Sequence, residues 1–184
     1  MKIVGMLLFC LSVGCTAEIA DEDGDAPIEE EVGISTDELG AARCHRHETI
    51  FPQTRDADRW IIDRALEWVD DRVMYSQVHT TDGWRQDCSG FVSMAWRLTG
   101  TKPGLVTWTM NERSHQIDWN QLRPGDALNI PHHHVFLFAG WVDGSHEELC
   151  AIEEYATGVP ASITRRSRHD VRSIGYQPIR RDPD

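Results

Sequence analysis

Apolar side chains recur every three or four residues along two stretches in the first half of the chain. In the stretch 56–73 the apolar positions are Trp60, Ile61, Ala65, Leu66, Trp68, Val69 and Val73. Charged residues stand between them, so the pattern predicts an amphipathic helix. A second helix is predicted over 88–99, with Asp87 as its N-cap and Gly100 as its C-terminal stop.

Farther along, the helical period gives way to short runs of β-branched and aromatic residues. The expected strands are 127–130, 134–142, 148–155 and a segment within 173–180. The sequence LRPGD at 122–126 predicts a turn before the first strand, and Asp143-Gly144 predicts a tight turn between the second and the third. Because helices come first and strands follow through short turns, we predict an α+β fold with N-terminal helices packed on an antiparallel β-sheet.

The first 15 residues are typical of an export signal. Lys2 is followed by an apolar run of about 13 residues, which is too short to span a bilayer as a helix. The sequence LSVGC at 11–15 resembles a bacterial lipobox, in which the cysteine is lipidated and becomes the new N-terminus. The resemblance implies an exported lipoprotein, periplasmic or at the cell surface, that meets the membrane only through a lipid on Cys15. Plain secretion is the alternative.

Charge is distributed unevenly between the remaining segments. Residues 16–40 carry ten acids and no base, whereas 41–184 carry 20 acids and 17 bases and so a net charge of 17 − 20 = −3. We expect 16–40 to be an acidic, disordered linker and 41–184 to be a single domain. The whole chain has a formal charge of −12, and the absence of a basic stripe argues against a nucleic-acid partner.

Cys88 is the first candidate for chemistry, because it stands in the first turn of the second predicted helix. The partial positive charge of a helix N-terminus favours a thiolate, and the free backbone N–H groups there can stabilise an oxyanion. Gly90 is expected to leave room for a substrate backbone. A buried or disulfide-bonded Cys88 is the structural alternative.

A nucleophilic cysteine needs a base, and the base must be held by a third group. His134 ends the triplet His132-His133-His134 and heads a predicted strand, and the next strand carries Glu153 and Glu154. A carboxylate there could orient the imidazole. Adjacent strand residues point to opposite faces, so the three histidines cannot converge on one ion. We therefore expect no metal site, and nothing in the sequence implies an organic cofactor.

Three blocks of sequence resemble, in order and spacing, the signatures of the NlpC family of papain-like cysteine hydrolases. They are DCSGFV at 87–92, LRPGDA at 122–127 and HVFLFAG at 134–140. The likeness covers roughly residues 56–156. It implies a papain-like NlpC fold for the domain.

The resemblance also implies roles for individual residues. It implies that Cys88 is the nucleophile and His134 the base, with Glu153 the best match to the family's third polar residue. Glu154 competes with Glu153, because a slip of one residue changes the face of a strand. The implied reaction is cleavage of amide bonds in peptidoglycan stem peptides, at or near the bond from D-glutamate to the diamino acid. Peptidoglycan peptides are then the expected partners, and we expect the protein to be a monomer.

Two departures from the family concern the substrate cleft. Of its Tyr-Xaa-Trp-Gly-Gly segment mainly Tyr75 remains, and 107–116 differs from its Arg-Thr-Ser-like loop. We expect Tyr75, Asp87 and Ser89 to contact the substrate. Two alternatives stay open: an amidase or acyltransferase that uses the same thiol on another acyl group, and a cell-wall-binding lipoprotein without catalysis.

Two cysteines remain after these assignments. Cys10 would leave with the signal peptide, so Cys44 and Cys150 are the unassigned pair. In an oxidising compartment they could form a disulfide that pins the N-terminal edge of the domain to the strand of Glu153. The alternative is a buried, apolar Cys150 and a free Cys44.

Overall fold

The computed structural model describes residues 44–183, so the expected signal peptide, Cys15 and the acidic linker lie outside the described residues. The helices in chain order are η1 (Arg46–Ile50), α2 (Phe51–Gln53), η2 (Asp56–Asp58), α3 (Arg59–Asp70), α4 (Cys88–Ala95), η3 (Thr99–Thr101), η4 (Met110–Glu112), η5 (Trp119–Gln121) and α5 (Arg168–Ile174). The strands are β1 (Ser76–Thr81), β2 (Trp84–Gln86), β3 (Ser114–Gln116), β4 (Ala127–Ile130), β5 (His134–Trp141), β6 (Glu148–Glu153), β7 (Ser162–Ser167) and β8 (Gln177–Arg181).

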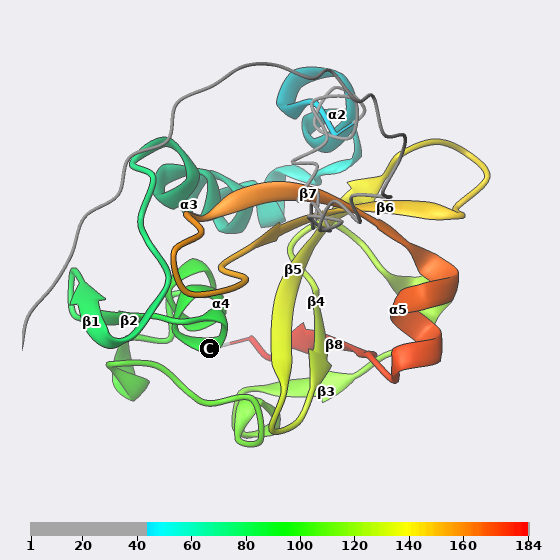
Figure 1. Ribbon diagram of the computed structural model, residues 1–184. Helices are drawn as coiled ribbons and strands as arrows, with labels where there is room; N and C mark the ends of the chain where they lie inside the picture. The colour runs from blue at the N-terminus through cyan, green and yellow to red at the C-terminus, as the bar shows by residue number, and fades with distance from the viewer. Residues whose placement is uncertain (1–43, 184) are drawn as a thin grey trace, which may run out of the picture. The chain divides into compact units, whose positions relative to one another are not determined.

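Six of these strands form one antiparallel sheet in the order β3-β8-β4-β5-β6-β7 (Figure 1). β1 and β2 form a separate hairpin, closed by Asp82 and Gly83, which both have positive φ. The mixture of helices with an antiparallel sheet confirms the predicted α+β class. No helix within residues 44–183 has the length and apolar character needed to cross a membrane.

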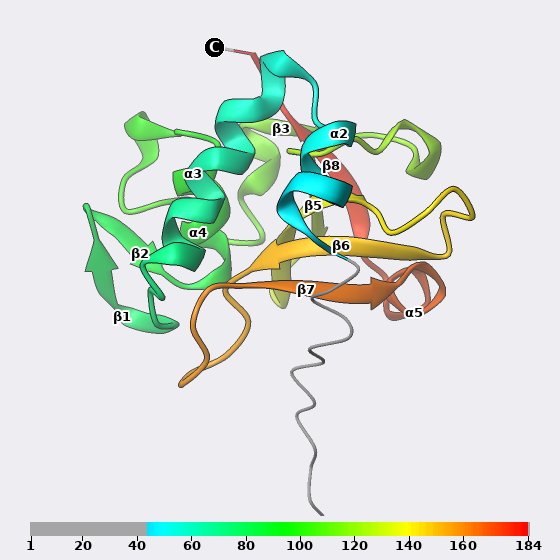
Figure 2. The same cartoon turned by 90° about the horizontal axis from the view of Figure 1, so that it is seen from above.

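β5 is the central strand of the core, and all of its residues are buried. Val135 and Leu137 belong to the apolar cluster that includes α3 and α4, whereas Phe136 and Phe138 belong to a second cluster with Val171 of α5. α3 and α4 accordingly lie to one side of β5 and α5 to the other (Figures 1 and 2). Strand alternation therefore sends consecutive side chains of β5 into two different environments.

The turn at 122–126 precedes β4 and is also hydrogen-bonded to β5 and β8. The carboxylate of Asp126, which is 2% exposed, accepts hydrogen bonds from the backbone N–H of Arg123 at 2.9 Å and from the guanidinium of Arg180 in β8. The backbone of Phe138 in β5 donates to the Asp126 carbonyl oxygen at 2.8 Å. One buried aspartate thus fixes the start of β4 against both neighbouring strands.

Several predicted boundaries are wrong by a few residues: the helix expected over 56–73 is η2 followed by α3, and the strand expected over 148–155 ends at Glu153. The helix expected over 88–99 ends at Ala95, because Arg97 takes a left-handed conformation (φ 58°) and Leu98 donates back to the Ser93 carbonyl oxygen at 3.0 Å. Gly100 is therefore not its stop. The strand expected within 173–180 is confirmed as β8, which begins at Gln177 after α5 has ended at Gly175 (φ 105°).

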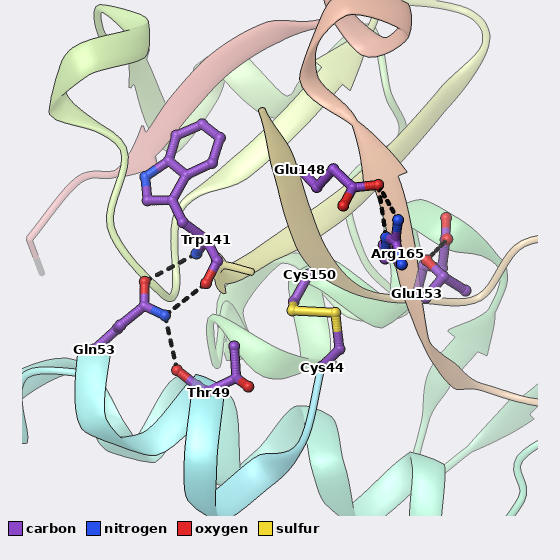
Figure 3. Close-up of a disulfide and its surroundings, with 9 residues drawn as sticks. Cys44, Thr49, Gln53, Trp141, Glu148, Cys150, Glu153 and Arg165 are labelled. Atoms are coloured by element: carbon purple, nitrogen blue, oxygen red, sulfur yellow. Dashed lines mark hydrogen bonds and ion pairs between the residues drawn. A yellow bond between two sulfur atoms is a disulfide. The ribbon is translucent and has the colours of Figure 1, made fainter. Parts of the chain in front are cut away.

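Cys44 and Cys150 form a disulfide, which confirms the pairing and excludes the free thiol (Figure 3). It joins the first described residue to β6 across 106 positions of sequence. Gln53 reinforces this junction: its amide donates to the Trp141 carbonyl oxygen at 2.7 Å and accepts from the Trp141 N–H at 2.9 Å. Gly140 permits this approach, because a Cβ there would lie 3.2 Å from the Gln53 amide.

Removing the disulfide should weaken the domain. Because the bridge closes a loop of more than 100 residues, Cys44→Ala should lower the free energy of unfolding by roughly 2 to 5 kcal/mol. Urea unfolding measures the loss. Cys88→Ala, the same change at a free cysteine, is the control, and an equal loss in both variants would contradict a stabilising bridge.

Candidate active site

Cys88 is the first residue of α4, and the sequence around it builds the helix start. The Asp87 carboxylate accepts from the Gly90 backbone N–H at 2.6 Å, which is the predicted N-cap. Asp87 also accepts from the Ser89 hydroxyl at 3.0 Å and from Arg85 Nε at 2.6 Å. The structure therefore places Asp87 and Ser89, which were expected to bind substrate, in the network that caps the helix.

Gly90 serves packing rather than substrate access, contrary to the expectation from sequence. A Cβ on Gly90 would lie 2.2 Å from the carbonyl oxygen of Arg85. The missing side chain lets α4 begin directly against the end of β2. Any other residue here would force the helix carrying Cys88 away from the hairpin.

His134 and Glu153 meet on one face of the sheet. A three-residue turn places His134 at the head of β5, opposite Ile130 of β4. Leu137 lies opposite Ile152 in the neighbouring strand pair, so Glu153 shares the face of His134. His134 Nε2 and Glu153 Oε2 are 3.0 Å apart, and the two residues are 9% and 0% exposed. This bond uses Nε2 and leaves Nδ1 as the ring nitrogen that can face a thiol.

Two residues that sequence reasoning missed complete the surroundings of Glu153. Thr164 donates its hydroxyl proton to Oε1, and Arg166 donates from Nε and Nη2 to Oε1 at 3.0 and 2.8 Å and from Nη2 to Oε2 at 2.7 Å. Burial raises the pKa of Glu153, but the hydrogen bond from His134 and the charge of Arg166 outweigh it and lower the pKa to about 2. Glu153 is therefore a carboxylate.

Aromatic rings enclose the imidazole on the face that it shares with Glu153. The centroids of Phe136, Tyr155 and Tyr176 lie 6.2, 5.7 and 6.4 Å from that of His134. The pair His134–Glu153 therefore lies in an environment poor in water, where its electrostatic interaction is strengthened.

The sulfur of Cys88 approaches the same strand from the opposite layer. Cys88 is 7% exposed and receives a hydrogen bond from the backbone of Val135, the residue after His134. Burial raises the pKa of the Cys88 thiol to about 11, with a smaller contribution from the charge of Asp87, and the backbone bonds from Val135 and Ser89 only partly offset this. The prediction that the helix N-terminus makes Cys88 a thiolate is therefore wrong: burial keeps the pKa of Cys88 well above neutral, and Cys88 is a thiol at neutral pH.

Glu154 takes no part in the hydrogen bond between Glu153 and His134. It is 0% exposed, and neither carboxylate oxygen has a hydrogen-bond partner within residues 44–183. Burial, together with the charge of Asp87, raises the pKa of Glu154 to about 8. Tyr75 is half-buried nearby, and its pKa is raised by burial and by the charges of Cys88, Asp87 and Glu154. Tyr75 thus lies near the candidate nucleophile.

The segment 107–116 contributes an exposed aromatic side chain that packs against the turn 131–133 between β4 and β5. Trp108 is 53% exposed and stacks on His132 with ring centroids 4.9 Å apart. Asn129 of β4 donates its side-chain amide to the Thr107 carbonyl oxygen at 3.0 Å and so fixes the base of this segment.

The scan against family models and the search of curated proteins both found no match to the chain. In the part of the chain that the structure describes, no three His, Cys, Asp or Glu side chains are grouped so that they could hold a metal ion.

The buried Glu154 should make stability depend on pH. The unfolded chain releases this proton near the ordinary pKa of 4.5 and the folded protein only near 8, so stability should fall as pH rises between these values. Glu154→Gln should remove the fall and raise the melting temperature at pH 8.5 by roughly 3–6 °C more than at pH 5. Thermal unfolding at both pH values measures this. The exposed Glu112→Gln is the control, and a pH-independent effect of Glu154→Gln would contradict the buried acid.

Proposed function

We propose that the protein is a cysteine hydrolase with a papain-like NlpC fold that cleaves amide bonds in peptidoglycan stem peptides. The observation that carries the proposal is the buried pair of His134 and Glu153 on β5 and β6, together with Cys88 at a helix N-terminus, where it receives a hydrogen bond from the backbone of Val135 next to His134. A nucleophile, a base and a group that orients the base are the three parts that thiol catalysis requires.

The high pKa of Cys88 determines how the first step would proceed. Because the sulfur rests as a thiol, its proton must leave as the sulfur attacks the carbonyl carbon of the substrate. His134 Nδ1 would accept that proton, while the hydrogen bond from Nε2 to Glu153 stabilises the imidazolium that forms. Backbone N–H groups in the first turn of α4 would stabilise the oxyanion of the tetrahedral intermediate.

The remaining steps, formation and hydrolysis of a thioester, would use the same groups. The tetrahedral intermediate collapses to a thioester on Cys88 as His134 returns the proton to the leaving amine. His134 then takes a proton from water as the water attacks the thioester. The C–S bond breaks to release the acid product, and His134 returns the proton to the sulfur of Cys88. Every proton passes through His134, and Glu153 remains ionised throughout.

The substrate assignment rests on the resemblance of the three sequence blocks to the NlpC family, together with the export signal expected at 1–15. We propose the bond from D-glutamate to the diamino acid as the target, with Tyr75 at the substrate cleft. We further propose that the protein is exported as a monomer and anchored by a lipid on Cys15, which would place it next to the cell wall.

Purified wall fragments provide the test. Incubation with the protein should convert stem peptides into two products whose masses sum to that of the substrate plus one water. Mass spectrometry before and after incubation measures this. Transfer to an added amine would identify an acyltransferase instead, and binding of fragments without any mass change would identify a non-catalytic wall-binding protein.

Removal of either central group should abolish hydrolysis without unfolding the domain. Cys88→Ala and His134→Ala should each lower kcat/KM by at least about 10³-fold, because nucleophile and base act as one unit. His133→Ala is the matched control, since His133 is exposed in the turn beside His134. Turnover of either variant close to wild type would show that the thiol and the imidazole are not the reacting groups.

A further inference from the structure

We infer that Arg166 is a positioning residue of this site, which fixes the Glu153 carboxylate and compensates its charge so that His134 rests as a neutral base. The inference rests on the proposed function, because it assigns Arg166 a role in the chemistry of His134.

The hydrogen bonds of Glu153 leave its carboxylate no freedom to turn. Oε2 accepts from His134 Nε2 and Arg166 Nη2, while Oε1 accepts from the Thr164 hydroxyl and from Arg166 Nε and Nη2. The forked guanidinium thus holds both oxygens at once, in the bidentate geometry that lysine cannot reproduce. Any rotation of the Glu153 carboxylate would break several of these hydrogen bonds at once.

Arg166 is itself held in place. Its guanidinium carbon lies 4.9 Å from the centroid of the Phe136 ring and 5.3 Å from that of Tyr155. Both rings also contact His134. The same two aromatic side chains therefore position the arginine and the imidazole on either side of Glu153.

The positive charge matters because Glu153 is wholly buried. An ionised carboxylate alone beside an imidazole favours the imidazolium, which cannot accept a proton from a thiol. His134 is in contact with Glu153 of β6 and with the phenol rings of Tyr155 and Tyr176. Arg166 of β7 pairs with Glu153, and Cys88 of α4 lies at the backbone of Val135, next to His134. The charge of Arg166 cancels that of Glu153, so the buried pair adds no net charge beside the imidazole.

The neighbouring Arg165 offers a matched control. It is adjacent to Arg166 on β7, but strand alternation sends it to the other face, where it pairs with Glu148 (Figure 3). A role for Arg166 that is only structural predicts similar consequences for both arginines. A role in positioning predicts that only Arg166 affects His134.

The test compares Arg166→Met, Arg166→Lys and Arg165→Met in the full chain. The pKa of His134 is read from NMR titration of its ring nitrogens, and kcat/KM is followed against pH on wall fragments. Arg166→Met should raise the pKa of His134 by about one unit or more and move the acidic limb of kcat/KM to higher pH. Arg166→Lys should keep the pKa within about 0.3 units of wild type yet lower kcat about tenfold, with KM unchanged. Arg165→Met should change neither quantity.

A second pair of variants keeps the test decisive if Arg166→Met does not fold. Glu153→Gln alone leaves the arginine charge facing His134 and should lower the pKa of His134 by about one unit, and adding Arg166→Met should bring it back toward wild type. If replacing Arg166 leaves the pKa of His134 unchanged in every folded variant, the inference is overturned. The NMR reading needs no substrate, so a protein that titrates as expected but cleaves nothing would contradict only the proposed function.

Discussion

The candidate site depends on one buried ion, the carboxylate of Glu153. A charge with no exposure to water is tolerated only when hydrogen bonds and an opposite charge replace the water that it has lost. Thr164 and Arg166 of β7 and His134 of β5 do so from both sides of β6. His134, Glu153 and Arg166 therefore lie next to one another across the sheet, in the order of their strands β5, β6 and β7.

β6 connects this cluster to the rest of the domain. Its alternation directs Glu153 toward the imidazole and Cys150 to the opposite face, where the disulfide ties the N-terminal edge of the described chain to the sheet. α4 packs on that opposite face and brings Cys88 to the head of β5. Cys88 thus lies against the backbone of Val135, the residue next to His134, and the two candidate groups come from two differently packed layers.

The sequence-based predictions succeeded where local periodicity decides the outcome. The helix period located α3 and the start of α4, the Asp87 cap was confirmed, and strand alternation explains why Glu153 rather than Glu154 lies against His134. Thr164 and Arg166 were missed because β7 is polar and only partly buried along its whole length, so it lacks the apolar alternation by which a strand is recognised. The state of the Cys88 thiol was predicted wrongly for a related reason: the helix dipole can be inferred locally, whereas burial depends on packing against β5.

The central claim is that His134 acts as the base for a thiol that is otherwise hard to ionise. The most direct measurement is the rate at which iodoacetamide alkylates Cys88 at pH 7 in the folded protein, followed by peptide mapping in the wild type and in His134→Ala. We expect the wild type to react at least about tenfold faster, because the imidazole removes the proton as the sulfur attacks. Equal rates in the two folded proteins would contradict the claim.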